Sequence, residues 1–191
     1  MKTEVKICGI TRYCDAAAIA EAGADYLGFV LVPSSKRCIR PEALAEMAAL
    51  PVKKAGVFAD QDLDFIRRMC ALGGLSIVQL HGSETYDFAR RIDFAEVWKA
   101  SYDPLFPAAR LVCDGPTGGS GRFGDHRKAA ELARIRPVML AGGITPDNAA
   151  GLIRQVRPAG IDLAGGVESA PGIKDMSKVR KLFENLKGLE L

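Results

Sequence analysis

Short apolar runs alternate with helix-like patterns along the whole chain. Many of these runs are rich in Val, Ile, Leu or Phe, which is typical of parallel strands buried on both faces. The predicted strands are Val5–Cys8, Tyr26–Leu31, Lys54–Phe58, Ser76–Leu80, Glu96–Lys99, Leu111–Asp114, Val138–Ala141 and Gly160–Ala164. The segments between them carry helix signals. Asp62 precedes a helical pattern that Gly73-Gly74 ends, and Thr145 precedes Pro146, so both polar residues are predicted helix caps.

Strict alternation of strands and helices predicts a parallel sheet. Eight such units over 191 residues favour a single (β/α)8 barrel domain spanning residues 1–191, an α/β fold. An open, doubly wound sheet is the structural alternative. The fifth helix is the exception, because Pro104 and Pro107 leave little room between the fifth and sixth strands. A loop or a single turn is predicted there.

Composition narrows the class of protein. There are 26 basic and 23 acidic residues, so the net charge is only +3, which argues against a nucleic-acid-binding protein. No apolar run approaches the ~18 residues of a membrane span, and the N-terminus has no signal-peptide pattern. Five cysteines without C-x-x-C spacing suggest reduced thiols. We therefore expect a cytoplasmic monomer or homodimer that binds neither nucleic acid nor membrane.

A repeated tetrapeptide marks the ends of the last two predicted strands. Leu140-Ala141-Gly142-Gly143 closes one apolar run, and Leu163-Ala164-Gly165-Gly166 closes the next, 23 positions later. Glycine pairs leave main-chain N–H groups open to an approaching ligand, because no side chain covers them. Such pairs on the last two strands of a barrel often hold a phosphate. The sequence thus predicts a phosphorylated small molecule as substrate.

Two polar groups lie where an acid and a base are expected. Side chains alternate along a strand, so Lys6 and Cys8 share one face, which we expect to point into the barrel. A neighbouring cation would favour the Cys8 thiolate, which can accept a proton. Asp114 follows three apolar residues and is expected at the same mouth, where it can act as a general acid. The structural alternatives are a small buried thiol for Cys8 and a turn cap for Asp114.

Further polar residues follow other strands. Asp162 has the same phase as Ala164 in the eighth strand, and His81 follows the fourth strand, but His81 receives no firm role. The loop after the second strand contains Arg37, whose planar guanidinium suits a carboxylate. Gly119–Gly124 matches the G-x-G-x-x-G pattern of a nucleotide-binding module, but no acid ends the next strand. A flexible lid after the sixth strand is the preferred interpretation of these glycines.

The ordered set of motifs resembles the phosphoribosylanthranilate isomerase family over nearly the whole chain. The segments that carry the resemblance are Val5 to Thr11, Gly23-Ala24-Asp25 with Gly28-Phe29, Pro33 to Arg37, Gly56-Val57-Phe58, Val78 to Gly82, Asp114 with Gly118 to Gly121, Leu140 to Ile144, Asp162 to Glu168 and Pro171 to Asp175. Other phosphate-binding barrels share single pieces of this set. An alternative is therefore a related barrel that acts on another phosphosugar.

The resemblance implies an isomerase of tryptophan biosynthesis that performs an Amadori rearrangement. It implies Asp114 as the general acid and Cys8 as the general base. Arg37 would bind the anthranilate carboxylate, and Asp162 would help to hold the substrate. Gly142, Gly143, Gly165 and Gly166 would hold the phosphate. No metal or cofactor is expected. Where the family often has two serines, this chain has Ala164-Gly165, so phosphate contacts there must come from main-chain N–H groups.

Overall fold

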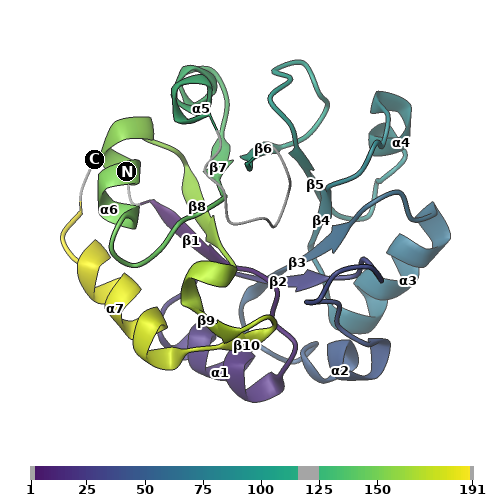
Figure 1. The fold of residues 1–191 in the computed structure, drawn as a ribbon. Helices are drawn as coiled ribbons and strands as arrows, with labels where there is room; N and C mark the ends of the chain where they lie inside the picture. Colours follow the sequence, from purple (N-terminus) through teal and green to yellow (C-terminus); the bar gives the residue numbers. More distant parts are fainter. Residues whose placement is uncertain (1–2, 116–124, 190–191) are drawn as a thin grey trace.

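The computed structural model describes residues 3–115 and 125–189, and it shows a closed barrel of eight parallel strands with helices around it (Figure 1). The barrel strands are β1 (Glu4–Ile7), β2 (Tyr26–Val30), β3 (Lys53–Phe58), β4 (Ile77–Leu80), β5 (Glu96–Ala100), β6 (Arg110–Cys113), β7 (Val138–Leu140) and β8 (Gly160–Leu163). They pair in chain order, and β8 closes on β1. The predicted (β/α)8 barrel is confirmed.

The helices lie on the outside of the barrel (Figure 1). They are α1 (Tyr13–Glu21), α2 (Pro41–Glu46), α3 (Leu63–Gly73), α4 (Tyr86–Arg90), α5 (His126–Ala133), α6 (Ala149–Val156) and α7 (Met176–Leu186). Asp62 caps α3 by accepting from the N–H of Phe65, and Gly74 ends that helix in the left-handed conformation, as the sequence predicts. The predicted cap at Thr145 is displaced, because residues 145–148 form a turn and α6 begins at Ala149.

Alternation of side chains divides the core into two layers. The outer layer, between strands and helices, includes Val5 and Ile7. The inner layer fills the barrel with Tyr26, Ala55, Ile77, Trp98, Val112, Met139 and Ala141. Lys6 is fully buried and pairs with Asp162 of the adjacent strand, which confirms that it points inward. The interior is therefore a packed core beneath the site, as is usual for this barrel type.

No helix lies between β5 and β6, where residues 101–109 are all described and form turns. The predicted loss of the fifth helix is thus confirmed. One side chain from another connection supports this segment. The Arg136 guanidinium donates to the carbonyl oxygens of Pro104 (2.6 Å), Phe106 (2.8 Å) and Ala108. These bonds supply partners for carbonyl groups that a helix would otherwise satisfy internally.

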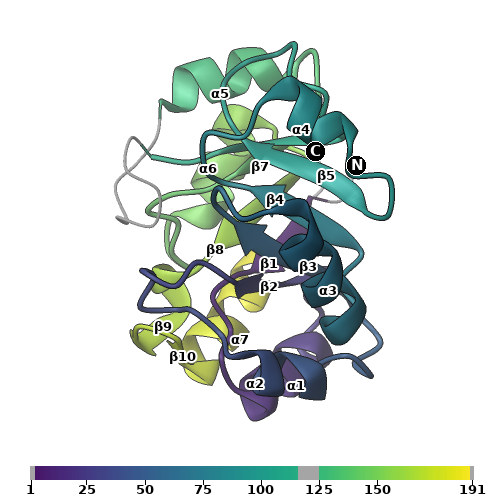
Figure 2. The same cartoon turned by 90° about the vertical axis from the view of Figure 1, so that its right-hand side faces the viewer.

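The chain adds a small hairpin after the last barrel strand. A short 3-10 turn (Gly165–Val167) leads into the antiparallel strands β9 (Glu168–Ala170) and β10 (Ile173–Lys174). Figure 2 shows this β9–β10 hairpin at one end of the barrel, beside the connection that follows β2. It was not predicted from the sequence. It brings Glu168 and Lys174 to the end of the barrel where strands β1 and β8 finish.

Candidate active site

The predicted site residues all lie at the carboxyl ends of the barrel strands. Cys8 follows β1, Asp162 lies within β8, and Asp114 follows β6. Arg37 lies between β2 and α2, and the two glycine pairs follow β7 and β8. Because the strands are parallel and form one closed barrel, these ends share a single mouth. Residues far apart in the sequence are therefore brought to the same end of the molecule.

Cys8 is buried at the rim of the barrel, with 8% of its surface exposed. A Cβ atom at Gly28 would lie 2.7 Å from its sulfur, so only glycine at that position leaves room for the thiol. Burial raises the pKa of Cys8 above its ordinary value, while Lys6 and Lys174 lower it in part. The expected effect of a neighbouring cation is present, but burial outweighs it. Cys8 is accordingly a neutral thiol at neutral pH.

A buried ion pair lies beneath Cys8. The Lys6 ammonium donates to Oδ2 of Asp162 at 2.7 Å. The other carboxylate oxygen, Oδ1, is buried and has no hydrogen-bond partner among the described residues. An unsatisfied buried acceptor is costly, and such atoms in native proteins often face a ligand. Asp162 can therefore accept a hydrogen bond from a hydroxyl or amine group of a bound molecule.

Asp114 has His81 as a neighbour across the mouth. The Nε2 atom of His81 lies 3.6 Å from Oδ2 of Asp114, and its Nδ1 atom lies 3.4 Å from Nε2 of Gln79. If Gln79 donates to Nδ1, the ring proton of neutral His81 is on Nε2 and faces the carboxylate. Burial lowers the pKa of His81, although Asp114 opposes this effect, which favours the neutral ring. His81 and Gln79, which received no role from the sequence, thus belong to this site.

The two glycine pairs meet at the mouth. Gly142 and Gly143 both have positive φ, at 83° and 63°, where other residues are strained. A Cβ atom at Gly166 would lie only 1.9 Å from the carbonyl oxygen of Ile144, so the two segments are in direct contact. Among the described residues, the main-chain N–H groups of the four glycines have no acceptor. This arrangement suits an anion such as a phosphate.

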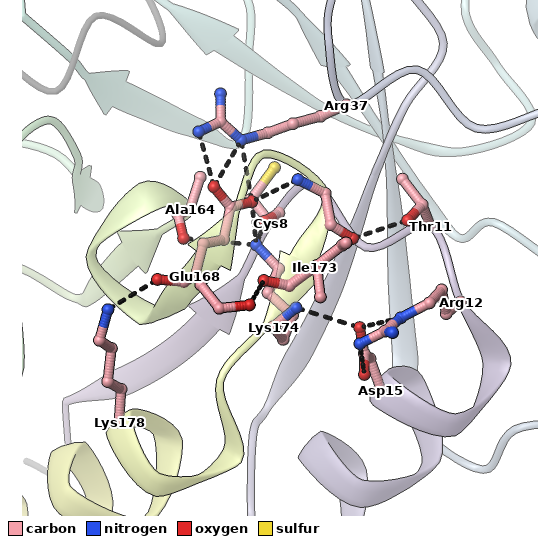
Figure 3. Close-up of polar contacts among 12 residues, drawn as sticks. Cys8, Thr11, Arg12, Asp15, Arg37, Ala164, Glu168, Ile173, Lys174 and Lys178 are labelled. Carbon is pink, nitrogen blue, oxygen red and sulfur yellow. Dashed lines mark hydrogen bonds and ion pairs between the residues drawn. The ribbon is translucent and has the colours of Figure 1, made fainter.

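Arg37 is held by a partner that the sequence analysis did not identify. Its guanidinium forms a bidentate ion pair with Glu168, in which Nε lies 2.9 Å from Oε1 and Nη2 lies 2.7 Å from Oε2 (Figure 3). Glu168 also accepts from Lys174 at 2.8 Å. Glu168 and Lys174 lie in two of the segments quoted for the resemblance, but nothing in their spacing indicates that they meet Arg37.

Comparisons with known proteins give the family of the chain. Residues 5–185 match the family model described as N-(5'-phosphoribosyl)anthranilate (PRA) isomerase. The chain belongs to this family. A phosphoribosylanthranilate isomerase from Geotalea uraniireducens is 41% identical, covering 98% of this chain and 100% of the relative. One from Chromohalobacter salexigens is 44% identical, covering 97% and 94%.

Solved structures of phosphoribosylanthranilate isomerases share the fold. The enzyme from Thermus thermophilus has a TM-score of 0.92 at 40% identity, covering 98% of this chain and 100% of that one. A second structure holds reduced 1-(o-carboxyphenylamino)-1-deoxyribulose 5-phosphate, with a TM-score of 0.88 at 33% identity and coverage of 98% and 100%. A structure of monomers generated from the dimeric phosphoribosylanthranilate isomerase of Thermotoga maritima has a TM-score of 0.87 at 34% identity, again covering 98% and 100%.

The predicted family and enzyme class are thus confirmed. The G-x-G-x-x-G match at Gly119–Gly124 and the predicted lid after the sixth strand fall on residues 116–124, outside the described part of the chain. Within the described ranges, no helix is long and apolar enough to cross a membrane.

Proposed function

We propose that this phosphoribosylanthranilate isomerase converts N-(5-phosphoribosyl)anthranilate to 1-(2-carboxyphenylamino)-1-deoxyribulose 5-phosphate in tryptophan biosynthesis. One observation carries the proposal. A buried thiol, Cys8, and the carboxyl group of Asp114 lie at the same barrel mouth as two pairs of glycines whose N–H groups have no acceptor among the described residues. Acid–base chemistry on a phosphorylated sugar needs this set of groups. Residues 1–191 form one catalytic domain in this proposal.

In the proposed mechanism, Asp114 donates a proton to the furanose ring oxygen, and the ring opens to a protonated Schiff base. The Cys8 thiolate then removes the proton from C2′ of the sugar, which gives an enolamine. Tautomerisation of the enolamine produces the ketone. The tautomerisation moves one proton from the 2′ hydroxyl group to C1′ and changes no net charge. Because Asp114 has lost one proton and Cys8 has gained one, Cys8 releases its proton to solvent and Asp114 takes one up before the next turnover. The N–H of His81 that faces Asp114 can stabilise the carboxylate formed in the first step.

Binding groups surround these two residues in the proposal. The glycine N–H groups of Gly142, Gly143, Gly165 and Gly166 hold the phosphate. Asp162 accepts a hydrogen bond from the substrate through its Oδ1 atom, which has no partner in the described part of the chain. Arg37 binds the carboxylate of the anthranilate ring, because Glu168 occupies only one edge of the guanidinium and leaves its other edge available.

Complementation tests the function directly. We expect the gene to restore growth without tryptophan to a bacterial strain that lacks this isomerase, and we expect the Cys8→Ala variant to fail. The purified protein should convert phosphoribosylanthranilate, measured by the loss of anthranilate fluorescence. Turnover of ribulose phosphates without turnover of phosphoribosylanthranilate would favour the related phosphosugar barrel. Saturable micromolar binding of NAD(P) would favour the nucleotide-binding module.

The pH dependence should report the Cys8 thiol. Because burial raises its pKa, the thiol is protonated at neutral pH, and the thiolate forms only as the pH increases. We therefore expect kcat/KM to rise from neutral to alkaline pH by about tenfold per unit while the thiolate is the minor form. Steady-state kinetics over this range measure the profile. The residual activity of Cys8→Ala should lack the rise, and a flat profile in the wild type would contradict the assignment.

The contact between the glycine pairs gives a second prediction. In Gly166→Ala the added Cβ would clash with the carbonyl of Ile144, so the two phosphate-binding segments must separate. We expect KM to rise about tenfold or more, which is the effect of weakening one hydrogen bond to a charged group. The competitive inhibition constant of inorganic phosphate should increase in parallel.

Gly151→Ala is the matched control. Gly151 lies in α6 and has open space where its Cβ would be. The change should leave KM unaltered and raise the free energy of unfolding by about 0.5–1 kcal/mol, because glycine is a poor helix former. An unaltered KM in Gly166→Ala would remove the glycine contact from the proposed phosphate site.

Three further assignments stay predictions: the localisation, the oligomeric state and the ligand. We propose a cytoplasmic enzyme that is a monomer or a homodimer and has a phosphorylated small molecule as its ligand. Size-exclusion chromatography with light scattering distinguishes the two oligomeric states.

A further inference from the structure

The Glu168 carboxylate joins two cations from distant parts of the chain (Figure 3). It is buried, with 7% of the residue exposed. Its Oε1 atom accepts from Nε of Arg37 at 2.9 Å, from the Lys174 ammonium at 2.8 Å and from the N–H of Gly172 at 3.1 Å. Its Oε2 atom accepts from Nη2 of Arg37 at 2.7 Å. This carboxylate is therefore fully hydrogen-bonded and has one preferred position.

The Arg37 side chain is confined on both sides as well. A Cβ atom at Gly9 would lie only 2.5 Å from Cδ of Arg37. The aliphatic part of the arginine therefore crosses the main chain next to Cys8. At its far end, Nη2 lies 3.4 Å from the place of a Cβ atom at Gly165. Within the described ranges, every hydrogen bond of the guanidinium goes to Glu168. The Nη1 group thus keeps its donors for another acceptor.

Lys174 ties this ion pair to the rest of the mouth. Its ammonium donates to the carbonyl of Cys8 at 2.6 Å and to the carbonyl of Ala164 at 3.3 Å, in addition to Glu168. These two carbonyls belong to the residue of the proposed base and to the residue before the glycine pair. The β9–β10 hairpin therefore fixes the arginine, the base and the phosphate-binding segment relative to one another.

The ion pairs of Glu168 leave one positive charge uncompensated. One carboxylate lies between two cations, Arg37 and Lys174. Burial raises the pKa of Glu168, but the hydrogen bonds from these cations outweigh burial, so its pKa lies below the ordinary value. The hydrogen bond with Glu168 raises the pKa of Arg37. Arg37, Lys174 and Glu168 together therefore carry a net charge of +1, which a bound carboxylate can neutralise.

We propose that Glu168 is a positioning residue that orients Arg37 to receive the aromatic carboxylate of the substrate. This inference rests on the proposed function. Glu168 binds the Nε edge of the guanidinium and so presents the opposite edge to the ligand. It acts through Arg37 and does not itself touch the substrate.

A pair of ligands that differ only in the carboxylate tests this role. The first is reduced 1-(o-carboxyphenylamino)-1-deoxyribulose 5-phosphate, and the second is its phenylamino counterpart, which lacks the carboxylate. In Glu168→Gln we expect the Kd of the carboxylated ligand, measured by calorimetry, to rise about 10- to 100-fold, the range expected when a recognition group is misplaced. The Kd of the second ligand should stay within about twofold of the wild-type value.

Two controls separate positioning from a loss of structure. Lys178→Met removes a 2.7 Å hydrogen bond to the main-chain carbonyl of Glu168 and leaves its carboxylate intact, so both Kd values should stay unchanged. In the Arg37→Met background, adding Glu168→Gln should produce no further loss for the carboxylated ligand. If Glu168→Gln does not fold, as judged by circular dichroism, Glu168→Asp keeps the charge, shortens the side chain and should show the same discrimination.

Two other outcomes overturn the inference. Equal weakening of both ligands would make Glu168 a structural residue only. Tighter binding of the carboxylated ligand would make Glu168 a competitor for Arg37. Failure of the wild-type protein to bind either ligand would instead refute the proposed function, which keeps the two failures distinguishable.

Discussion

Replacing Cys8 by alanine is expected to lower kcat by about 10²- to 10⁴-fold, the usual contribution of a general base. Alanine has no group that can take the proton from C2′ of the sugar. The position of the sulfur supports this expectation, because it fills the space above Gly28 at the rim of the barrel, next to the Lys6 side chain. The measurement is steady-state turnover of phosphoribosylanthranilate by the purified variant, with its fold checked by circular dichroism.

Cys14→Ala is the control for this variant, because Cys14 is an exposed thiol in α1 and its loss should not change kcat. The binding of the reduced product analogue should persist in Cys8→Ala, since the base contributes to the proton transfer and not to phosphate or carboxylate recognition. Turnover near the wild-type rate would show that another group removes the proton.

Replacing Asp114 by asparagine should cost a similar factor, about 10²- to 10⁴-fold in kcat. The amide keeps the size of the side chain but cannot supply a proton to the ring oxygen, so ring opening becomes the slow step. Among the described residues, the nearest alternative donor is His81, at 3.6 Å, and it is a poor substitute because burial lowers its pKa. Single-turnover kinetics with phosphoribosylanthranilate measure the effect on the chemical step.

Asp103→Asn is the corresponding control. Asp103 also follows a barrel strand, but its carboxylate pairs with the hydroxyl of Tyr86 and the N–H of Leu105. We expect kcat to be unchanged and the free energy of unfolding to fall. If Asp114→Asn retained wild-type turnover, the proton for ring opening would have to come from elsewhere.

The sequence was sufficient for the barrel because each strand carries a local signal. Buried parallel strands such as β7 are apolar runs, and the predicted strands lie within about one residue of their observed ends. The missing fifth helix was also predictable, since Pro104 and Pro107 act locally. The start of α6 was not, because Thr145 caps a turn that precedes the helix, and a helical pattern does not distinguish the two.

The site was predicted only in part, for a physical reason. Strand ends of a parallel barrel converge, so Cys8, Asp114 and Asp162 could be placed at one mouth from their positions alone. The partner of Arg37, Glu168, lies 131 residues away in a hairpin. The two strands of this hairpin have three and two residues, which is too short for a visible alternation of apolar and polar positions. Its identity depends on tertiary packing.

The pKa of Cys8 could also be predicted only in part from the sequence. The neighbouring cation was predicted from the phase of Lys6, but the extent of burial was not, and burial decides the direction of the pKa. Desolvation is a property of everything packed around a group, so no short motif encodes it.

The segment between β5 and β6 shows how a barrel of this kind can lack one of its outer helices. Leu105 is 79% exposed there, and Phe106, at 4% exposed, anchors the segment in the core. The Arg136 guanidinium, on the connection between α5 and β7, supplies hydrogen bonds to three carbonyl groups of this segment. One arginine from a neighbouring connection can therefore take over part of the hydrogen bonding that a helix would provide. The eight-stranded barrel stays closed without the fifth helix.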